Sequence, residues 1–131
     1  MLSDENLERY ARQAIMPDIG EEGQERLLES RMLVVGAGGL GSPAIFYLAA
    51  AGVGSLTIMD GESVDLTNLN RQILHTTASI GSPKVTQAAA TVAALNPGVN
   101  VTPLAERLED DNVCLLYTSP SPRDRTRSRM P

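Results

Sequence analysis

The chain has 131 residues, a formal net charge of -5 at pH 7, one cysteine and one histidine. This length accommodates one domain at most, and a doubly wound sheet normally needs more chain. The acidic balance argues against a nucleic-acid partner, and the single cysteine, Cys114, excludes a disulfide framework or zinc cluster. No apolar run reaches the ~20 residues of a membrane span and no signal peptide opens the chain, so we expect a cytoplasmic protein without a membrane partner.

Residues 1–30 predict a helical extension that precedes the first strand. Ser3 or Asp4 can cap a helix that continues through Ala14 and ends at Pro17. Gly20 then opens a second helix, which carries apolar residues on one side and charged residues on the other. Packing and solubility account for both helices.

The segment 31–60 predicts a strand, a glycine turn, a helix and a second strand. An apolar run leads into Gly36-Ala37-Gly38-Gly39-Leu40-Gly41, a helix is predicted over 43–51, and a β-rich run over 56–59 ends at Asp60. In such a unit the three glycines of the GxGxxG pattern permit a tight turn, close approach to a phosphate, and close packing of helix on strand. Asp60 stands at the distance from them expected for a carboxylate that holds a ribose hydroxyl. We therefore predict a nucleotide site.

After Asp60 the chain is loop-like, with a short helix predicted over 68–74, a helix over 84–95 and a third parallel strand over 100–104. The predicted fold class is α/β: a Rossmann-like parallel sheet with helices on both faces, preceded by two N-terminal helices and truncated after about three strands. We assign 31–113 to this partial nucleotide-binding domain.

Residues 114–131 break the pattern. Serine, proline and arginine replace any periodicity, so we predict neither helix nor strand there. The string resembles the translation of a transposon-end adapter used in sequencing libraries. We therefore expect a non-native or disordered tail, and a natural gene product that continues beyond Val113.

Three polar residues between the second and third strands are candidate phosphate ligands. Arg71 and Lys84 flank a loop on the carboxyl side of the sheet, where open α/β folds bind their ligands. Arginine can hold a phosphate through two parallel hydrogen bonds, and lysine acts as a compact charge. Asn68 can orient the ligand. His75 has no acidic or cysteine partner nearby in the sequence, so we expect a loop or capping role for it.

An ordered set of motifs resembles the HesA/MoeB/ThiF family, the bacterial relatives of the ubiquitin-activating enzymes. The set comprises residues 10–13 (YARQ), the glycine turn, residues 51–54 (AGVG), Asp60, residues 68–72 (NLNRQ), and Pro83-Lys84. This resemblance covers about residues 4–113.

The resemblance implies an adenylyltransferase that binds ATP and Mg²⁺ and adenylates the C-terminal glycine of a ubiquitin-like sulfur-carrier protein, in the thiamine or molybdopterin pathway. It implies that Arg12 reaches the partner's site of a homodimer as an arginine finger, and that Arg71 and Lys84 act on the phosphates. The nucleotide-binding residues it implies are Gly36, Gly38, Gly39, Gly41, Asp60, Thr67, Asn68, Leu69, Asn70, Arg71 and Lys84.

The sequence departs from that pattern after the third strand. The family's later Mg²⁺-binding aspartate and the paired cysteines that hold zinc in many members are absent, so we expect Mg²⁺ and zinc sites only in the full-length parent, and no activity in this chain. Two alternatives stay open: an NAD-dependent oxidoreductase, which the glycines and Asp60 equally allow, and a non-catalytic nucleotide-binding fragment.

Overall fold

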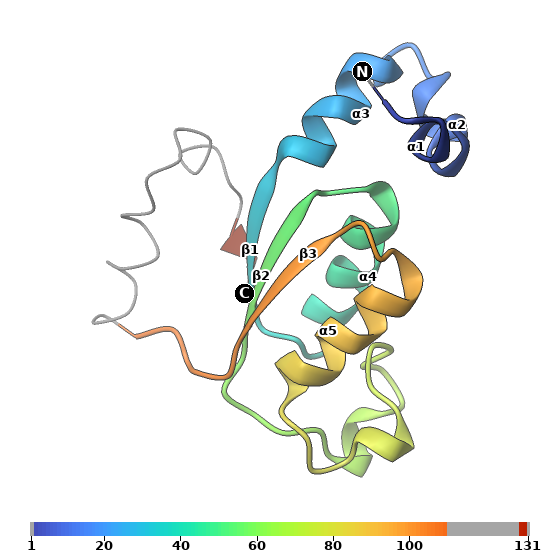
Figure 1. Cartoon of the computed structure of the whole chain (residues 1–131). Coiled ribbons are helices and arrows are strands. Elements are labelled where there is room, and N and C mark those ends of the chain that lie inside the picture. The colour runs from blue at the N-terminus through green and yellow to red at the C-terminus, as the bar shows by residue number, and fades with distance from the viewer. Residues whose placement is uncertain (1, 110–128, 131) are drawn as a thin grey trace.

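The computed structural model describes residues 2–109 and 129–130, which build a parallel sheet in the order β3-β2-β1-β4 (Figure 1). Strands β1 (Arg31–Val35), β2 (Ser55–Met59) and β3 (Asn100–Leu104) pair along their full lengths. Val35 pairs with Met59, and Met59 with Leu104, so the three strands end at one edge. The predicted strands and their parallel pairing are confirmed.

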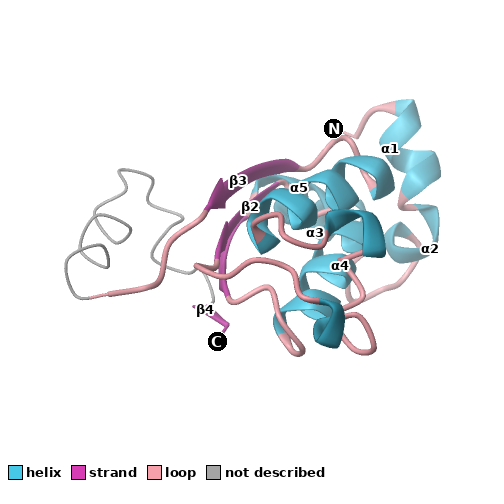
Figure 2. Ribbon diagram, turned by 90° about the horizontal axis from the view of Figure 1, so that it is seen from below, coloured by secondary structure: helices cyan, strands magenta, loops and turns pink. Residues whose placement is uncertain are grey.

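Helices α4 (Gly41–Ala51) and α5 (Lys84–Leu95) pack against the same face of the sheet in both ribbon views (Figures 1 and 2). Alternate strand residues such as Val34, Leu56 and Ile58 point toward them and form the core with Ile45 and Val92. Each of these side chains is at least 99% buried, and burial of this kind is the main source of folding free energy. The sequence predicts helices on both faces of the sheet. The two helices that connect its strands, α4 and α5, both lie on this face.

The N-terminal extension contains three helices rather than two: α1 (Asp4–Arg9), α2 (Ala11–Ala14) and α3 (Gly20–Glu29). Ser3 caps α1 as predicted, with its side chain accepting a hydrogen bond from Asn6 N. The single helix predicted through Ala14 is interrupted at Tyr10, whose ψ of 17° departs from helical values. Tyr10 is 2% exposed, so burial of the aromatic side chain overrides continuation of the helix.

The short helix predicted over 68–74 is wrong. The structure instead has two short 3-10 helices, η1 (Leu66–Asn68) and η2 (Thr77–Ser79), with turns between them. Asp65 accepts a hydrogen bond from Thr67 N, and Asn68 Oδ1 accepts one from Asp65 N. These side-chain bonds compete with the bonds that would extend a helix.

The expected tail largely lies outside the described residues, which omit 110–128 and 131. The exception is β4 (Arg129–Met130), a two-residue strand parallel to β1 at Leu33 and Val34. No strand was predicted there. Among the described residues, no helix combines the length and apolar character required to cross a membrane.

Candidate nucleotide site

The glycine turn links β1 to α4 at the edge where the strands end. Gly36 has a φ of 99°, which side-chain-bearing residues rarely adopt, and its N–H donates to Met59 O over 2.7 Å. A Cβ on Gly41 would collide with the backbone carbonyl of Gly36. The tight turn and the close packing of helix on strand therefore both require glycine, as predicted.

The side chains of Asp60 and His75 hold Ala37, the residue between the first two glycines of the turn. Ala37 donates its N–H to Asp60 Oδ2 over 2.8 Å, and its carbonyl oxygen lies 2.7 Å from His75 Nε2. Asp60 Oδ1 accepts a second bond, from Glu62 N, over 2.8 Å. An ionised carboxylate has about four acceptor positions, so Asp60 keeps capacity for a ribose hydroxyl while it fixes the turn.

The next four backbone N–H groups have no acceptor among the described residues: those of Gly38, Gly39, Leu40 and Gly41. They stand at the start of an 11-residue helix. Unpaired N–H groups and the positive end of the helix dipole make such a position a binding site for an anion. The turn therefore offers a phosphate four preorganised donors.

The segment 68–72 packs onto this turn. A Cβ built on Gly39 would lie 3.8 Å from Arg71 Nε, and one built on Gly38 would lie 3.5 Å from Gln72 Nε2. The side of Gly38 on which a Cβ would stand therefore faces the Gln72 side chain. Close approach of its backbone to a phosphate stays a prediction. Any phosphate held here would meet the N–H groups of the turn and the side chains of this segment together.

Hydrogen bonds within the segment hold its functional groups in place. Arg71 Nη1 donates to Thr67 O and to Asn70 Oδ1, over 3.1 and 3.2 Å, and these bonds leave its other nitrogens available. Asn68 uses Oδ1 as a cap and keeps its amide nitrogen for a ligand. Thr67 and Asn70 thus orient Arg71, and a nucleotide-binding role for Leu69 stays a prediction.

Lys84 is the first residue of α5 and is 4% exposed. Its Nζ lies 3.5 Å from Glu62 Oε1, a carboxylate whose side chain is 62% exposed. A buried ammonium at the positive end of a helix dipole is poorly compensated by one distant, solvated carboxylate. An anionic ligand close to Nζ would balance the remaining positive charge of the Lys84 ammonium.

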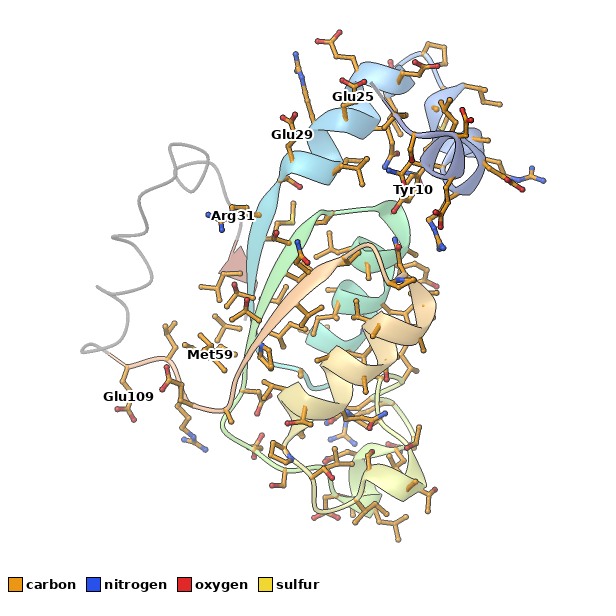
Figure 3. The ribbon with its side chains drawn as sticks, in the orientation of Figure 1. Tyr10, Glu25, Glu29, Arg31, Met59 and Glu109 are labelled. Carbon is orange, nitrogen blue, oxygen red and sulfur yellow. The ribbon has the colours of Figure 1, made fainter. Side chains whose placement is uncertain are left out.

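A cavity of about 320 Å³ opens at the ends of β1, β2 and β3. Its lining residues are Val35, Gly36, Met59, Asp60, Gly61, Glu62, Glu106, Arg107 and Leu108. Figure 3 shows the Met59 side chain on the face of the sheet away from α4 and α5. The lining combines apolar surface from Val35, Met59 and Leu108 with charged side chains that include Asp60. This combination suits a base and its ribose, and the volume lies in the range of small-molecule pockets.

Sequence reasoning missed residues 106–108 of this cavity. The signal that points to them is their position directly after the third strand, at the edge where the carboxyl ends of parallel strands bind ligands. Among the described residues, no three His, Cys, Asp or Glu side chains gather as a metal site, so the Mg²⁺ and zinc sites stay expectations.

Arg12 lies apart from these residues, on α2. Neighbouring Gln13 and Gln24 of α3 both donate to Ala51 O over 3.1 Å, at the last residue of α4. Because α4 rises about 16 Å from end to end, the extension packs one helix length from the glycine turn. Arg12 is exposed and makes no hydrogen bond with the described residues.

Buried polar contacts join the extension to the body of the fold. Asn96 Nδ2 donates to Tyr10 Oη over 2.7 Å and to Ala49 O over 2.9 Å, and Figure 3 shows Tyr10 on the side of the extension that meets the body. A Cβ on Gly52 would stand 2.7 Å from both Tyr10 and Gln24. Tyr10 and Gln13 of the YARQ motif therefore anchor the extension.

The comparisons with known proteins agree with this geometry. The model of the ThiF family matches residues 10–121. The SAMP-activating enzyme E1 of Haloferax volcanii is 53% identical over 107 residues, which cover 82% of this chain and 40% of that protein. The molybdopterin-synthase adenylyltransferase of Salmonella typhimurium is 48% identical over 120 residues, covering 92% of this chain and 48% of that one.

A solved structure has the same architecture. The E. coli tRNA N6-threonylcarbamoyladenosine dehydratase TcdA, in complex with ATP, superposes with a TM-score of 0.81 at 32% identity, covering 88% of this chain and 46% of that one. The chain thus spans less than half the length of each of these relatives. The family model nonetheless covers most of its residues, and the chain belongs to the ThiF family.

Proposed function

We propose that this chain carries the ATP-binding part of an adenylyltransferase that activates the C-terminal glycine of a ubiquitin-like sulfur-carrier protein. The observation that carries the proposal is the set of four unpaired N–H groups at the glycine turn, onto which the Arg71 side chain packs. Support also comes from the family match and from relatives named as adenylyltransferases or activating enzymes.

The proposed reaction joins a carboxylate to a nucleotide. A carboxylate oxygen of the carrier attacks the α-phosphorus of ATP, the bond to the β-phosphate oxygen breaks, and pyrophosphate leaves with the electron pair. The incoming carboxylate and the triphosphate are both anionic, so fixed cations and N–H donors stabilise the transition state most. Arg71, Lys84 and the turn supply these groups, and Asp60 and the cavity hold the nucleoside. No protein nucleophile is needed.

The described residues fit ATP, but the proposed reaction also needs a second subunit, Mg²⁺ ligands and a surface that binds the carrier. We propose that Arg12 completes the site of a second subunit in a homodimer, because its helix lies one α4 length from its own glycine turn and its side chain is exposed. Mg²⁺, when bound, would neutralise charge on the departing pyrophosphate. We propose that its ligands and the docking surface for the carrier belong to the part of the relatives' length that this chain does not span.

The name of the TcdA structure raises a second substrate class, a group on tRNA. The acidic balance of the chain and the higher identity to an enzyme named for molybdopterin synthase favour a protein substrate. The oxidoreductase alternative explains the glycines and Asp60 but requires neither Arg71 nor Lys84.

The test is ATP–pyrophosphate exchange, driven by a ubiquitin-like carrier that ends in Gly-Gly. We expect exchange from a chain extended to the length of its relatives, none from the 131-residue chain, and loss of exchange in Arg71→Ala and Lys84→Ala versions of the extended chain. If neither chain catalyses exchange, while NADH and not ATP binds to this one, the proposal fails.

A further inference from the structure

The last residue of the NLNRQ motif, Gln72, has no role in the nucleotide site proposed so far. Gln72 is 3% exposed, yet its side chain makes no hydrogen bond with the residues that the structure describes. Its oxygen Oε1 is fully buried and unpaired. Buried polar groups in folded proteins are nearly always paired, so an unpaired one requires an explanation, and a ligand is one such explanation.

The orientation of the carboxamide places its nitrogen nearest the glycine turn. Nε2 is 3.5 Å from the position that a Cβ on Gly38 would occupy, whereas Cδ is 3.9 Å away. Nε2 makes no hydrogen bond and, unlike Oε1, keeps some contact with solvent. A donor without an acceptor thus stands beside the first of the four unpaired N–H groups, with Arg71 packed on the adjacent Gly39.

The neighbouring residues hold Gln72 in this position. Its backbone N–H donates to Asn68 O over 2.9 Å, and its carbonyl accepts from His75 N over 3.0 Å. His75 in turn bonds the Ala37 carbonyl of the turn. The backbone is therefore fixed on both sides of the contact, and burial limits the positions that the carboxamide can take.

We propose that Gln72 is a further nucleotide-binding residue, whose Nε2 donates a hydrogen bond to a phosphate oxygen held at the glycine turn. This inference rests on the proposed function, because it requires a nucleotide phosphate there. The chemistry that it recognises is the anionic phosphate chain, and it makes no contribution to binding of the base or ribose.

The first test uses the wild-type 131-residue chain labelled with ¹⁵N and follows side-chain amide resonances by NMR. We expect the Gln72 Nε2 resonance to shift on addition of ATP or tripolyphosphate and to stay in place with adenosine. An unchanged Gln72 resonance while the Gly38 and Gly39 amide resonances shift with ATP would overturn this inference and leave the proposed function standing. No response of any resonance to ATP would overturn both.

The second test compares two glutamine substitutions. Gln72→Met keeps the length of the side chain and removes its donor, and we expect about a tenfold rise in the Kd for ATP with an unchanged Kd for adenosine. Gln87→Met is the control, because Gln87 of α5 bonds Leu74 O and Thr91 Oγ1 instead. Equal losses of ATP and adenosine affinity in Gln72→Met would indicate a structural role and overturn the inference. If this variant does not fold, the wild-type NMR result decides.

Discussion

His75 Nε2 lies 2.7 Å from the carbonyl oxygen of Ala37, so an imidazole from the loop after β2 holds the turn that follows β1. The other ring nitrogen, Nδ1, is buried and has no partner in the part of the chain that the structure describes. A neutral ring that carries its proton on Nε2 satisfies this geometry, because Nε2 then donates to the carbonyl. His75 is the loop residue that the sequence suggests, and its task is to shape the glycine turn.

Burial lowers the pKa of His75 below its ordinary value, since desolvation disfavours the charged ring. The hydrogen bond to Ala37 opposes this effect, nearby Lys84 adds to it, and Asp60 opposes it. The chain has one histidine, so the imidazole proton signals follow this residue alone. We expect the NMR titration to give a pKa below 6.5, the ordinary value for histidine. A midpoint at or above that value would contradict the buried, neutral ring.

The same shift predicts the direction of pH dependence. In the unfolded chain His75 takes up its proton near pH 6.5, and in the native state at lower pH. Between these two values the unfolded state binds more protons, so the free energy of unfolding decreases as pH falls through this window. Urea unfolding at several pH values should show that His75→Gln loses less stability than wild type across it. Parallel curves for the two proteins would argue against the prediction.

Gly41 and Gly39 make a matched pair for the glycine turn. Gly41→Ala should destabilise the fold by at least about 3 kcal/mol, because the new methyl meets the rigid Gly36 carbonyl. Gly39→Ala should preserve stability to within about 1 kcal/mol, because its methyl meets only the Arg71 side chain at ordinary contact distance. Thermal unfolding followed by circular dichroism measures both. Similar melting temperatures for the two variants would show that the turn is looser than described.

How the extension is anchored can be tested at Asn96. Asn96→Leu leaves the buried Tyr10 hydroxyl unpaired and removes the bonds to Ala49 O, which keeps its bond from Gly52 N, and from Gly98 N, so it should cost about 2–3 kcal/mol. Tyr10→Phe removes one partner while Asn96 keeps its bond to Ala49 O, so the expected cost is about 1 kcal/mol. Urea unfolding measures the difference. A larger loss in Tyr10→Phe than in Asn96→Leu would place the anchor elsewhere.

Much of this fold could be predicted because its local signals agree with its packing. The glycine turn, the strands that flank it and the helix that begins at Lys84 each combine the right periodicity with the right terminal residues. The break at Tyr10 could not be predicted, because its cause is a contact with Asn96, 86 residues further along the chain. The missing helix over 68–74 reflects side-chain bonds at Asp65 that periodicity does not reveal.

The position of the candidate site could be predicted from the sequence, but the contacts within it could not. Asp60 was expected to bind a ribose on the basis of its spacing, but its bonds to Ala37 N and Glu62 N depend on how two loops meet. Residues 106–108 were not predicted, because a cavity wall formed after a strand has no sequence motif of its own. Spacing thus indicated the edge of the sheet at which we propose that a nucleotide binds, and the structure shows which side chains converge there.

Lys84 and Glu62 should have opposite effects on nucleotide affinity. Lys84→Met removes a buried cation from the phosphate site, so we expect the Kd for ATP to rise at least about tenfold. Glu62→Gln removes the carboxylate that competes with the ligand for Lys84, so the Kd should fall. Isothermal titration with ATP measures both, with adenosine as the control ligand for Lys84→Met. Weaker ATP binding by Glu62→Gln would mean that the carboxylate contributes to the site.

The position of Arg12 predicts complementation between subunits. If Arg12 acts in its partner's site, Arg12→Ala and Arg71→Ala versions of the extended chain are each inactive in pyrophosphate exchange. A mixed dimer then restores one site, which combines an intact Arg71 with the partner's intact Arg12. Random association makes half of the dimers mixed, so an equal mixture should regain about a quarter of wild-type activity. Each variant assayed alone is the control. Recovery fails if Arg12 acts in its own subunit, because every site then lacks one of the two arginines.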